Sequence, residues 1–316
     1  MAQQFGRRLM RAMILRTLKW LLALAIAGLL AFVGVVHWFF YDNRMPHDGT
    51  FPLDFAALHQ AADAIPGEKA TRIEVETVSH TPVPRIAMVA GTGWKKIDMV
   101  RNSYRVVFPE GSLIIDTGQD RADALRFGAN AYDVEAWTRI LAGIASADTI
   151  VLTHGHGDHA GGLAASEDVP GIAGKARLSA AQIATMANGG LDTSAFRPTL
   201  DYDGVLALAP GVALIAAPGH TPGSQMVYVQ LAGGQEYLFM GDTASMADNV
   251  RLGRIRSHYV TDRIGKDDRH AVFLQTAALQ RLAAEDPGLV LVPGHDASAT
   301  AAFEAQGLLQ PGFSGP

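Results

Sequence analysis

The sequence predicts an α+β protein in which two mixed β-sheets are faced by helices, preceded by one N-terminal helix that spans a membrane. Three observations lead to this prediction. Short apolar runs rich in β-type residues alternate with helical patterns along most of the 316-residue chain. Two neighbouring runs flank a Pro-Glu-Gly turn at residues 109–111, which is typical of a hairpin. Residues 20–41 contain no charged side chain, which is typical of a transmembrane helix.

The composition limits the possible functions. The apolar fraction of 48% indicates a globular protein with a membrane segment and argues against disorder. Residues 1–19 hold five basic side chains and no acidic one, so the rest of the chain has 21 basic groups against 31 acidic ones. This large part has no overall attraction for a polyphosphate, and we expect no nucleic-acid partner. The absence of cysteine excludes disulfides, thiolate ligands and a cysteine nucleophile, and it is compatible with any compartment.

The N-terminal residues predict a single-pass membrane protein. After the basic tail of residues 1–19, residues 20–41 would form a helix of about 33 Å, enough to cross a bilayer. Aromatic residues at both ends are typical of interfacial belts: Trp20, Trp38, Phe39, Phe40 and Tyr41. By the positive-inside rule the tail is cytoplasmic and the large domain lies on the outer, periplasmic or extracytoplasmic side. The alternative is a cleaved signal peptide, which would have a shorter apolar region followed by small residues.

Residues 42–70 are expected to form either a linker or a cap, and the sequence leaves both alternatives open. They include a short alanine-rich helix, residues 55–65, which ends at Pro66-Gly67. The large domain of residues 71–316 begins with strand patterns. These are residues 72–78, 85–89, 104–108 and 112–115.

The later elements alternate between helix and strand. Helices are predicted at residues 133–144, 180–187 and 268–285. Ser179 and Asp267 are the expected N-caps of the second and third of these helices. The polar loop of residues 189–204 is either a lid over a binding site or an ordinary surface loop. The tail after Gln306 is rich in glycine and proline, and we expect it to be frayed.

The stretch of residues 153–162, Thr-His-Gly-His-Gly-Asp-His-Ala-Gly-Gly, directly follows an apolar strand pattern at residues 149–152. It places three imidazoles and one carboxylate within six positions, where a buried strand opens into a loop. Neutral imidazole and carboxylate are the usual protein ligands of zinc and similar ions. The glycines permit the sharp backbone that brings near-neighbour imidazoles to one point. The stretch therefore predicts a metal site.

This His-x-His-x-Asp-His pattern after a strand resembles the signature of the metallo-β-lactamase-fold hydrolases. The resemblance covers roughly residues 71–305, because each later ligand of that family also has a match directly after an apolar run. It implies a four-layered αββα sandwich with the metal site at one edge. It also implies a set of seven ligands: His154, His156, Asp158, His159, His220, Asp242 and His295.

The resemblance implies two divalent metal ions rather than one. His154, His156 and His220 would hold one ion, and Asp158, His159 and His295 would hold the other. Asp242 would bridge the two ions. A hydroxide shared by the metals would then attack the substrate, and Asp158 would orient it and pass its proton on. Nitrogen and oxygen ligands suit zinc, which is the default, and also iron, manganese or cobalt.

Asp242 favours a particular branch of the family. True β-lactamases of this fold usually carry cysteine or serine at this position, whereas aspartate resembles the lactonase, glyoxalase II, phosphodiesterase and nuclease branches. The leading hypothesis is a hydrolase of a small carboxylic ester, lactone or thioester. The alternatives are a phosphodiesterase or nuclease, a β-lactamase, or a non-catalytic binding module, which loss of ligands would reveal. The oligomeric state is not predicted.

Several side chains near the motifs receive supporting or ordinary roles. In the family, the aspartate at position 116 supports the site without binding metal. Lactonases commonly have a tyrosine three residues after the bridging aspartate, where this chain has Ser245. His258 or Tyr259 could replace it, although packing or surface roles are the simpler interpretation for both. The remaining histidines after residue 41 are interpreted as ordinary residues: His47, His59, His80 and His270.

Overall fold

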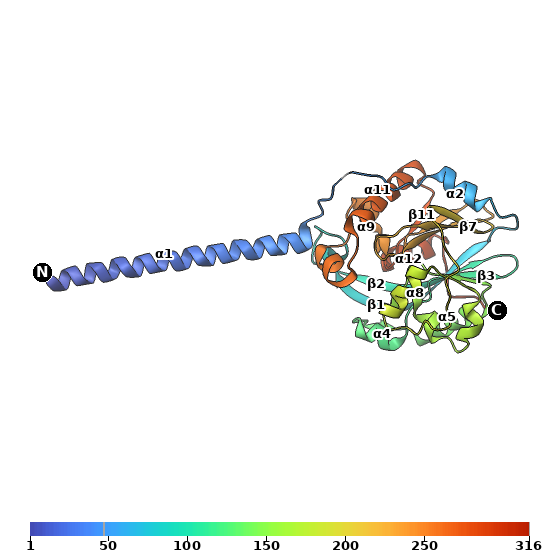
Figure 1. Cartoon of the computed structure of the whole chain (residues 1–316), viewed down its shortest axis with the longest axis horizontal. Helices are drawn as coiled ribbons and strands as arrows, with labels where there is room; N and C mark the ends of the chain where they lie inside the picture. The colour runs from blue at the N-terminus through green and yellow to red at the C-terminus, as the bar shows by residue number, and fades with distance from the viewer. Residues whose placement is uncertain (47, 316) are drawn as a thin grey trace.

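Two β-sheets packed face to face form the centre of the protein in the computed structural model, which describes residues 1–46 and 48–315 (Figure 1). The first sheet has the order β12-β1-β2-β3-β5-β6, with β4 paired to β1. Its strands are β1 (Arg72–Pro84), β2 (Lys96–Val107), β3 (Ser112–Ile115), β4 (Ala131–Tyr132), β5 (Thr149–Val151), β6 (Ala176–Arg177) and β12 (Gln310–Pro311). The second sheet has the order β11-β10-β9-β8-β7. Its strands are β7 (Val205–Ala209), β8 (Val212–Ala216), β9 (Gln225–Gln230), β10 (Glu236–Phe239) and β11 (Val290–Val292).

Helices cover the outer faces of both sheets, which gives four layers. The helices that follow the N-terminal one are α2 (Phe55–Ala62), α3 (Arg85–Met88), α4 (Arg121–Arg126), α5 (Val134–Ser146), α6 (Gly157–Ala165), α7 (Val169–Ala173), α8 (Ala180–Asn188), α9 (Ala247–Leu252), α10 (His258–Val260), α11 (Arg269–Glu285) and α12 (Ala297–Ala305). A 3₁₀ turn, η2 (Gly241–Ala244), and a π turn, η3 (Thr261–Gly265), complete them. The predicted α+β class and αββα arrangement are confirmed.

Three apolar clusters hold the layers together. The central cluster lies between the sheets and includes Tyr104 and Phe239, whose rings meet edge to face at 4.8 Å. A second cluster packs α2 and α11 against the second sheet. A third packs α5, α6 and α8 against the first sheet. Burial at about 25 cal/mol per Å² of apolar surface makes these contacts the main stabilising term of the fold.

Local sequence signals explain most element boundaries. The hairpin between β2 and β3 closes through Phe108 N–H, which donates to Gly111 O at 3.1 Å, and Gly111 takes the positive φ of 81° that the turn requires. Helix α8 begins with a capping box between Ser179 and Gln182, as the predicted cap requires. Helix α11 is capped by Asp268, so the prediction of Asp267 as its cap was wrong. Asp267 instead bonds Arg256 and His220.

Two further predictions were wrong. Residues 85–88 form the short helix α3 rather than a strand, since Arg85 and Ile86 donate backbone hydrogen bonds to Lys95 and Gly93 of a tight loop. The C-terminal tail is packed and not frayed. There β12 pairs with β1, Phe313 is buried, and Ser314 bonds the buried carboxylate of Glu74.

The N-terminal helix projects from one end of the sandwich (Figure 1). It consists of α1 (Ala2–Val36) and a closing π turn, η1 (His37–Tyr41). Residues 4–41 are long and apolar enough to cross a membrane, with a mean hydropathy of 2.3 in their most apolar window. Residues after this helix run along the second sheet and lead to α2, whose Leu58 and Ala62 lie in the second apolar cluster. Exposed Glu110 lies in the turn after β2, and the other end of this strand, at Lys96, follows Trp94, which contacts Phe40 of η1.

Candidate metal centre

Four strand ends bring all seven predicted ligands together at one edge of the sandwich. The segment after β5 carries four of them, and the segments after β8, β10 and β11 carry one each. Parallel pairing of β5 with β3 and of β11 with β10 aligns the carboxyl ends of these strands. Asp242 lies in η2 directly after β10, and Asp158 and His159 lie in the first turn of α6. The predicted ligand positions therefore form one cluster of imidazoles and carboxylates.

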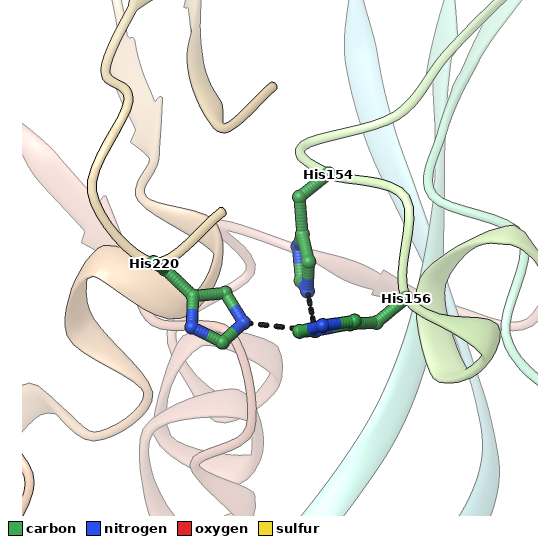
Figure 2. A group of neighbouring side chains, drawn as sticks. All are labelled: His154, His156 and His220. Atoms are coloured by element: carbon green, nitrogen blue, oxygen red, sulfur yellow. Dashed lines mark hydrogen bonds between the residues drawn. The ribbon is translucent and has the colours of Figure 1, made fainter. Parts of the chain in front are cut away.

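The first group consists of His154, His156 and His220, which converge from two loops (Figure 2). The Nε2 atoms of His154 and His220 lie 3.0 and 2.9 Å from the same atom, Nδ1 of His156. Nδ1 of His156 can take part in only one ordinary hydrogen bond, because it carries either one hydrogen or one lone pair. Hydrogen bonding therefore explains only one of the two short contacts. Nitrogens bound to tetrahedral zinc lie about 3.3 Å apart, so a cation among the three rings fits this arrangement.

The electrostatics of this group favour neutral rings with free lone pairs. Burial lowers the pKa of His154 well below its ordinary value, and the neighbouring imidazoles lower it further. Burial likewise lowers the pKa of His156 to about 4, with His220 adding to the effect. Burial and then the Arg256 guanidinium lower the pKa of His220. Neutral imidazole is the form that binds a metal ion.

The second group lies beside the first and contains Asp158, His159, Asp242 and His295. Nε2 of His295 lies 3.3 Å from Nε2 of His159, 2.9 Å from Oδ1 of Asp242 and 3.6 Å from Oδ2 of Asp158. Oδ2 of Asp242 lies 3.5 Å from Nε2 of His220, a member of the first group. The two oxygens of Asp242 thus face different groups, as a carboxylate shared by two ions requires.

The carboxylates of the second group are ionised in this setting. Burial alone would raise the pKa of Asp242, but His295 and Arg256 outweigh it and hold the pKa well below its ordinary value. Burial would also raise the pKa of Asp158, which His159 and Arg101 lower instead. Burial would lower the pKa of His159, but the carboxylates of Asp116 and Asp158 raise it to about 9. The cluster thus concentrates carboxylate charge beside imidazole nitrogens, and His159 would release its Nε2 proton on binding a divalent ion.

Hydrogen bonds behind the cluster fix the orientation of the rings. Nδ1 of His159 donates to Asp116 at 2.8 Å, and Nδ1 of His295 donates to the Val100 carbonyl at 2.8 Å. Nδ1 of His220 donates to Asp267 at 3.1 Å. Each bond leaves Nε2 of its ring turned toward the centre. Such carboxylate–histidine and carbonyl–histidine pairs are typical behind metal ligands.

Asp116 makes several hydrogen bonds behind the cluster, and its backbone conformation is unusual. Its carboxylate also accepts from Thr153 N–H at 2.6 Å and from Thr153 Oγ1 at 2.8 Å. Its φ of 57° places the backbone in the left-handed region, which aspartate tolerates better than most residues. Asp116 therefore fixes both the start of the histidine motif and the His159 ring, in agreement with the supporting role expected for it.

Sequence reasoning missed three further members of the site. Arg101 on β2 donates from Nε to Oδ2 of Asp158 at 2.8 Å. Arg256 donates from Nη1 to Oδ2 of Asp242 at 2.8 Å and from Nη2 to Oδ2 of Asp267 at 2.6 Å. Arg101 had one available signal, a basic residue within an otherwise buried strand pattern. Arg256 and Asp267 lie in a loop without any periodic pattern.

The side chains considered as tyrosine replacements have other partners. Ser245, at the position itself, donates from Oγ to Oδ1 of Asp242 at 3.2 Å. The His258 ring stacks on Trp38 and its Nδ1 bonds Asp262, while Tyr259 stacks on Phe40. His258 and Tyr259 therefore have packing roles, which was the simpler of the two interpretations from the sequence.

The histidines interpreted as ordinary pair with nearby acids. His59 bonds Glu236 at 3.0 Å, His80 bonds Asp98 at 2.7 Å, and His270 lies 3.4 Å from Asp48. His47 lies outside the described residues.

Comparisons with known proteins agree with this geometry. Residues 97–295 match the family model of the metallo-beta-lactamase superfamily. The hydroxyacylglutathione hydrolase of Anaeromyxobacter dehalogenans (strain 2CP-C) is 35% identical over 155 residues, which are 48% of this chain and 48% of that protein. The chain thus matches about half the length of this relative.

Solved structures share the same fold. A quorum-quenching N-acyl homoserine lactone lactonase superposes with a TM-score of 0.55 at 18% identity, over 74% of this chain and 95% of the lactonase. A dizinc quorum-quenching lactonase in complex with a product superposes with a TM-score of 0.52 at 15% identity, over 72% of this chain and 89% of that one. At these identities the likeness concerns the fold alone.

Proposed function

Because the chain belongs to the metallo-beta-lactamase superfamily and is a metal-dependent hydrolase, we propose that it cleaves small carboxylic esters, lactones or thioesters from a membrane-anchored position. One observation carries the proposal: the Asp242 carboxylate, whose two oxygens face the two imidazole groups. This arrangement suits two ions with a shared carboxylate. The hydroxyacylglutathione hydrolase and the N-acyl homoserine lactone lactonase to which the chain is similar are both named for acyl substrates.

The residues fit two divalent ions, with zinc as the default and iron, manganese or cobalt as the other candidates. His154, His156 and His220 would hold one ion, Asp158, His159 and His295 the other, and Asp242 both. When bound, such a pair supplies an activated water nucleophile and polarises the carbonyl that is attacked.

Asp158 is the proposed catalytic residue. Its side chain is 21% exposed, so water and substrate can reach it, while Arg101 fixes its Oδ2 from behind. An ionised carboxylate in this position can accept a hydrogen bond from the attacking water and carry its proton to the leaving group. The His159 ring, held by Asp116, keeps its orientation throughout. No serine or cysteine nucleophile is required.

The alternatives share the centre but differ in what surrounds it. A phosphodiesterase or nuclease would benefit from basic surface for its substrate, whereas residues 20–316 carry an excess of acidic groups. A β-lactamase would more commonly lack the carboxylate at position 242. These observations favour the carboxylic substrates.

The test is a comparison of initial rates with the zinc-loaded full chain in lipid nanodiscs. The substrates are a lactone, a thioester, an aryl ester, a phosphodiester and a β-lactam, with Asp158→Ala as the blank. We expect one of the three carboxylic substrates to be cleaved fastest, by about tenfold or more over the phosphodiester. A preference for the phosphodiester or the β-lactam would overturn the assignment.

We also propose that residues 20–41 span a membrane once, with residues 1–19 in the cytoplasm and residues 71–316, the catalytic domain, on the outer side. The uncharged helix and the five basic side chains before it support this orientation. Residues 42–70 then follow the span on the outer side.

Truncation tests the anchor. A variant that begins at residue 37 is expected to leave the membrane fraction and stay folded. A variant that begins at residue 42 should also be released, with a melting temperature several degrees lower, because it loses the Phe40 contacts with Trp94 and Tyr259. Fractionation and thermal unfolding measure both effects. If the residue-37 variant remained with membranes after a carbonate wash, the helix would not be the anchor.

A further inference from the structure

The end of the N-terminal helix is fixed directly to the catalytic domain. The Trp38 ring stacks on His258 at 4.2 Å, and Phe40 stacks on Tyr259 at 5.5 Å and meets Trp94 at 4.9 Å. Gly91 N–H donates to Phe40 O at 2.8 Å. These contacts hold η1 against α10 and the loop after α3, beside the orange segment at the base of the helix in Figure 1.

The two residues directly after the apolar helix are also fixed to the folded domain. Asp42 is buried, and Asn43 exchanges hydrogen bonds with Gly253 O at 3.2 Å and Ile255 N–H at 3.0 Å. The apolar span and the folded domain are therefore joined without a free linker. If the span crosses a bilayer, its outer end sets the height of the domain above the membrane.

Exposed apolar side chains surround this junction. We call the surface formed by Trp38, Tyr41, Trp94, Tyr259 and Ile264 the junction face. Trp94, Tyr259 and Ile264 are 52%, 46% and 66% exposed, which is high for such large apolar side chains. Indole Nε1 of Trp94 donates to Tyr41 Oη at 3.2 Å, so the two aromatic side chains are joined across the junction.

The composition of the junction face matches a lipid headgroup region. Tryptophan and tyrosine concentrate at membrane–water interfaces, where their apolar rings and polar tips are both solvated. Lys95 and Arg263 are sequence neighbours of Trp94 and Ile264, and the Arg263 guanidinium lies 5.5 Å over the Phe39 ring. Arg44, three residues after Tyr41, is paired with Asp42. Basic side chains at this level can reach anionic headgroups.

The segment that carries part of the junction face also forms a wall of the metal centre. Within residues 256–267, Tyr259 and Ile264 are exposed, while Arg256 and Asp267 bond Asp242 and His220. A methyl group on Gly265 would lie 3.7 Å from Cε1 of His220. This stretch of backbone therefore borders both the junction face and the first imidazole group.

We propose that the junction face sits in the headgroup region of the bilayer, and that the centre consequently acts on amphiphilic acyl substrates drawn from that bilayer. The acyl chain of such a substrate stays among the lipids while its ester, lactone or thioester group rises to the metal centre. This inference rests on the proposed hydrolase function and on the membrane span, and it adds the substrate class.

The chain contains no cysteine, so a single introduced cysteine reports on one position without background. Ile264→Cys places a nitroxide label on the junction face. Glu110→Cys is the matched control, because exposed Glu110 follows β2, whose twelve residues separate it from Lys96 by about 35 Å. The full chain is reconstituted into nanodiscs of phosphatidylcholine and phosphatidylglycerol, and power saturation compares access of oxygen with access of a water-soluble nickel chelate.

We expect the oxygen-to-nickel access ratio to be several-fold higher at position 264 than at position 110. Equal ratios would overturn the placement of the junction face in the bilayer. This readout does not depend on any activity.

A pair of substrates tests the consequence for catalysis. The 4-nitrophenyl esters of acetate and dodecanoate are compared in the same nanodiscs, with wild type, Ile264→Asp and Ile264→Leu. A charge at position 264 is expected to lower the dodecanoate rate about tenfold and to change the acetate rate less than twofold. The leucine variant should retain both rates. Equal effects on the two esters would overturn the inference, whereas cleavage of neither ester by the zinc-loaded wild type would contradict the proposed function itself.

Discussion

Replacing Asp242 with asparagine is expected to lower the hydrolysis rate by at least about a thousandfold and to reduce the bound metal from two ions toward one. The carboxylate has one oxygen 2.9 Å from His295 and the other 3.5 Å from His220. An amide offers one oxygen and no charge, so it cannot serve both groups. Rates on the preferred substrate and metal analysis of the purified protein measure the two effects.

Asparagine is preferred to alanine here because Arg256 also bonds Asp242. Alanine would remove one of the carboxylates that pair with this buried guanidinium, and breaking a buried pair costs about 3–5 kcal/mol of folding free energy. The alanine variant should therefore lose both activity and stability, while the asparagine variant keeps an acceptor oxygen for Arg256 and should lose less stability. Full activity in either variant would rule out Asp242 as the shared ligand.

Replacing Asp116 with alanine is expected to weaken metal binding by about 10- to 100-fold, although Asp116 is not among the predicted ligands. The change leaves Nδ1 of His159 and N–H of Thr153 without their acceptor in a buried place. It also puts alanine at a φ of 57°, which costs roughly 1–2 kcal/mol. Competition with a chelator measures the affinity, and thermal unfolding measures the stability.

Asp116→Asn is the matched control. Asparagine tolerates the left-handed backbone and keeps one acceptor oxygen, so it should recover much of the stability and only part of the metal affinity. If alanine and asparagine bound metal as tightly as the wild type does, the orienting role of Asp116 would be wrong.

The convergence of the seven predicted ligands could be anticipated because its signals are local. Each ligand directly follows a short apolar strand, and strands that pair in parallel deliver their carboxyl ends to one edge. The first two histidines after β5 are separated only by a single glycine, so their convergence could be predicted without knowing any distant partner. The same holds for the hairpin at Gly111 and the cap at Ser179, where the decisive atoms lie within four residues.

The elements that escaped prediction depend on distant partners. The tail looked frayed by composition, yet Glu74 and Glu76 of β1 are buried and accept hydrogen bonds from Ser314 and Phe313. These glutamates alternate along β1 as solvent-facing residues would. The tail covers them together with Arg105 and Arg139, so both faces of the strand are buried.

The supporting residues of the site were missed for the same reason. Arg256 lies 14 residues from Asp242 in sequence, and Arg101 lies 57 residues from Asp158. Their roles come from loops and strands that meet in space. No periodicity or spacing in the sequence predicts these contacts between distant segments.

The seven predicted ligands come from both sheets. His154, His156, Asp158 and His159 follow β5 of the first sheet, while His220, Asp242 and His295 follow strands of the second. In a chain without cysteine, a metal pair held by both sets would act as a cross-link between the two halves of the sandwich, as a disulfide does in many secreted proteins. Chelation would then loosen the halves at the edge where substrate enters, so the cofactor would secure the architecture as well as the chemistry.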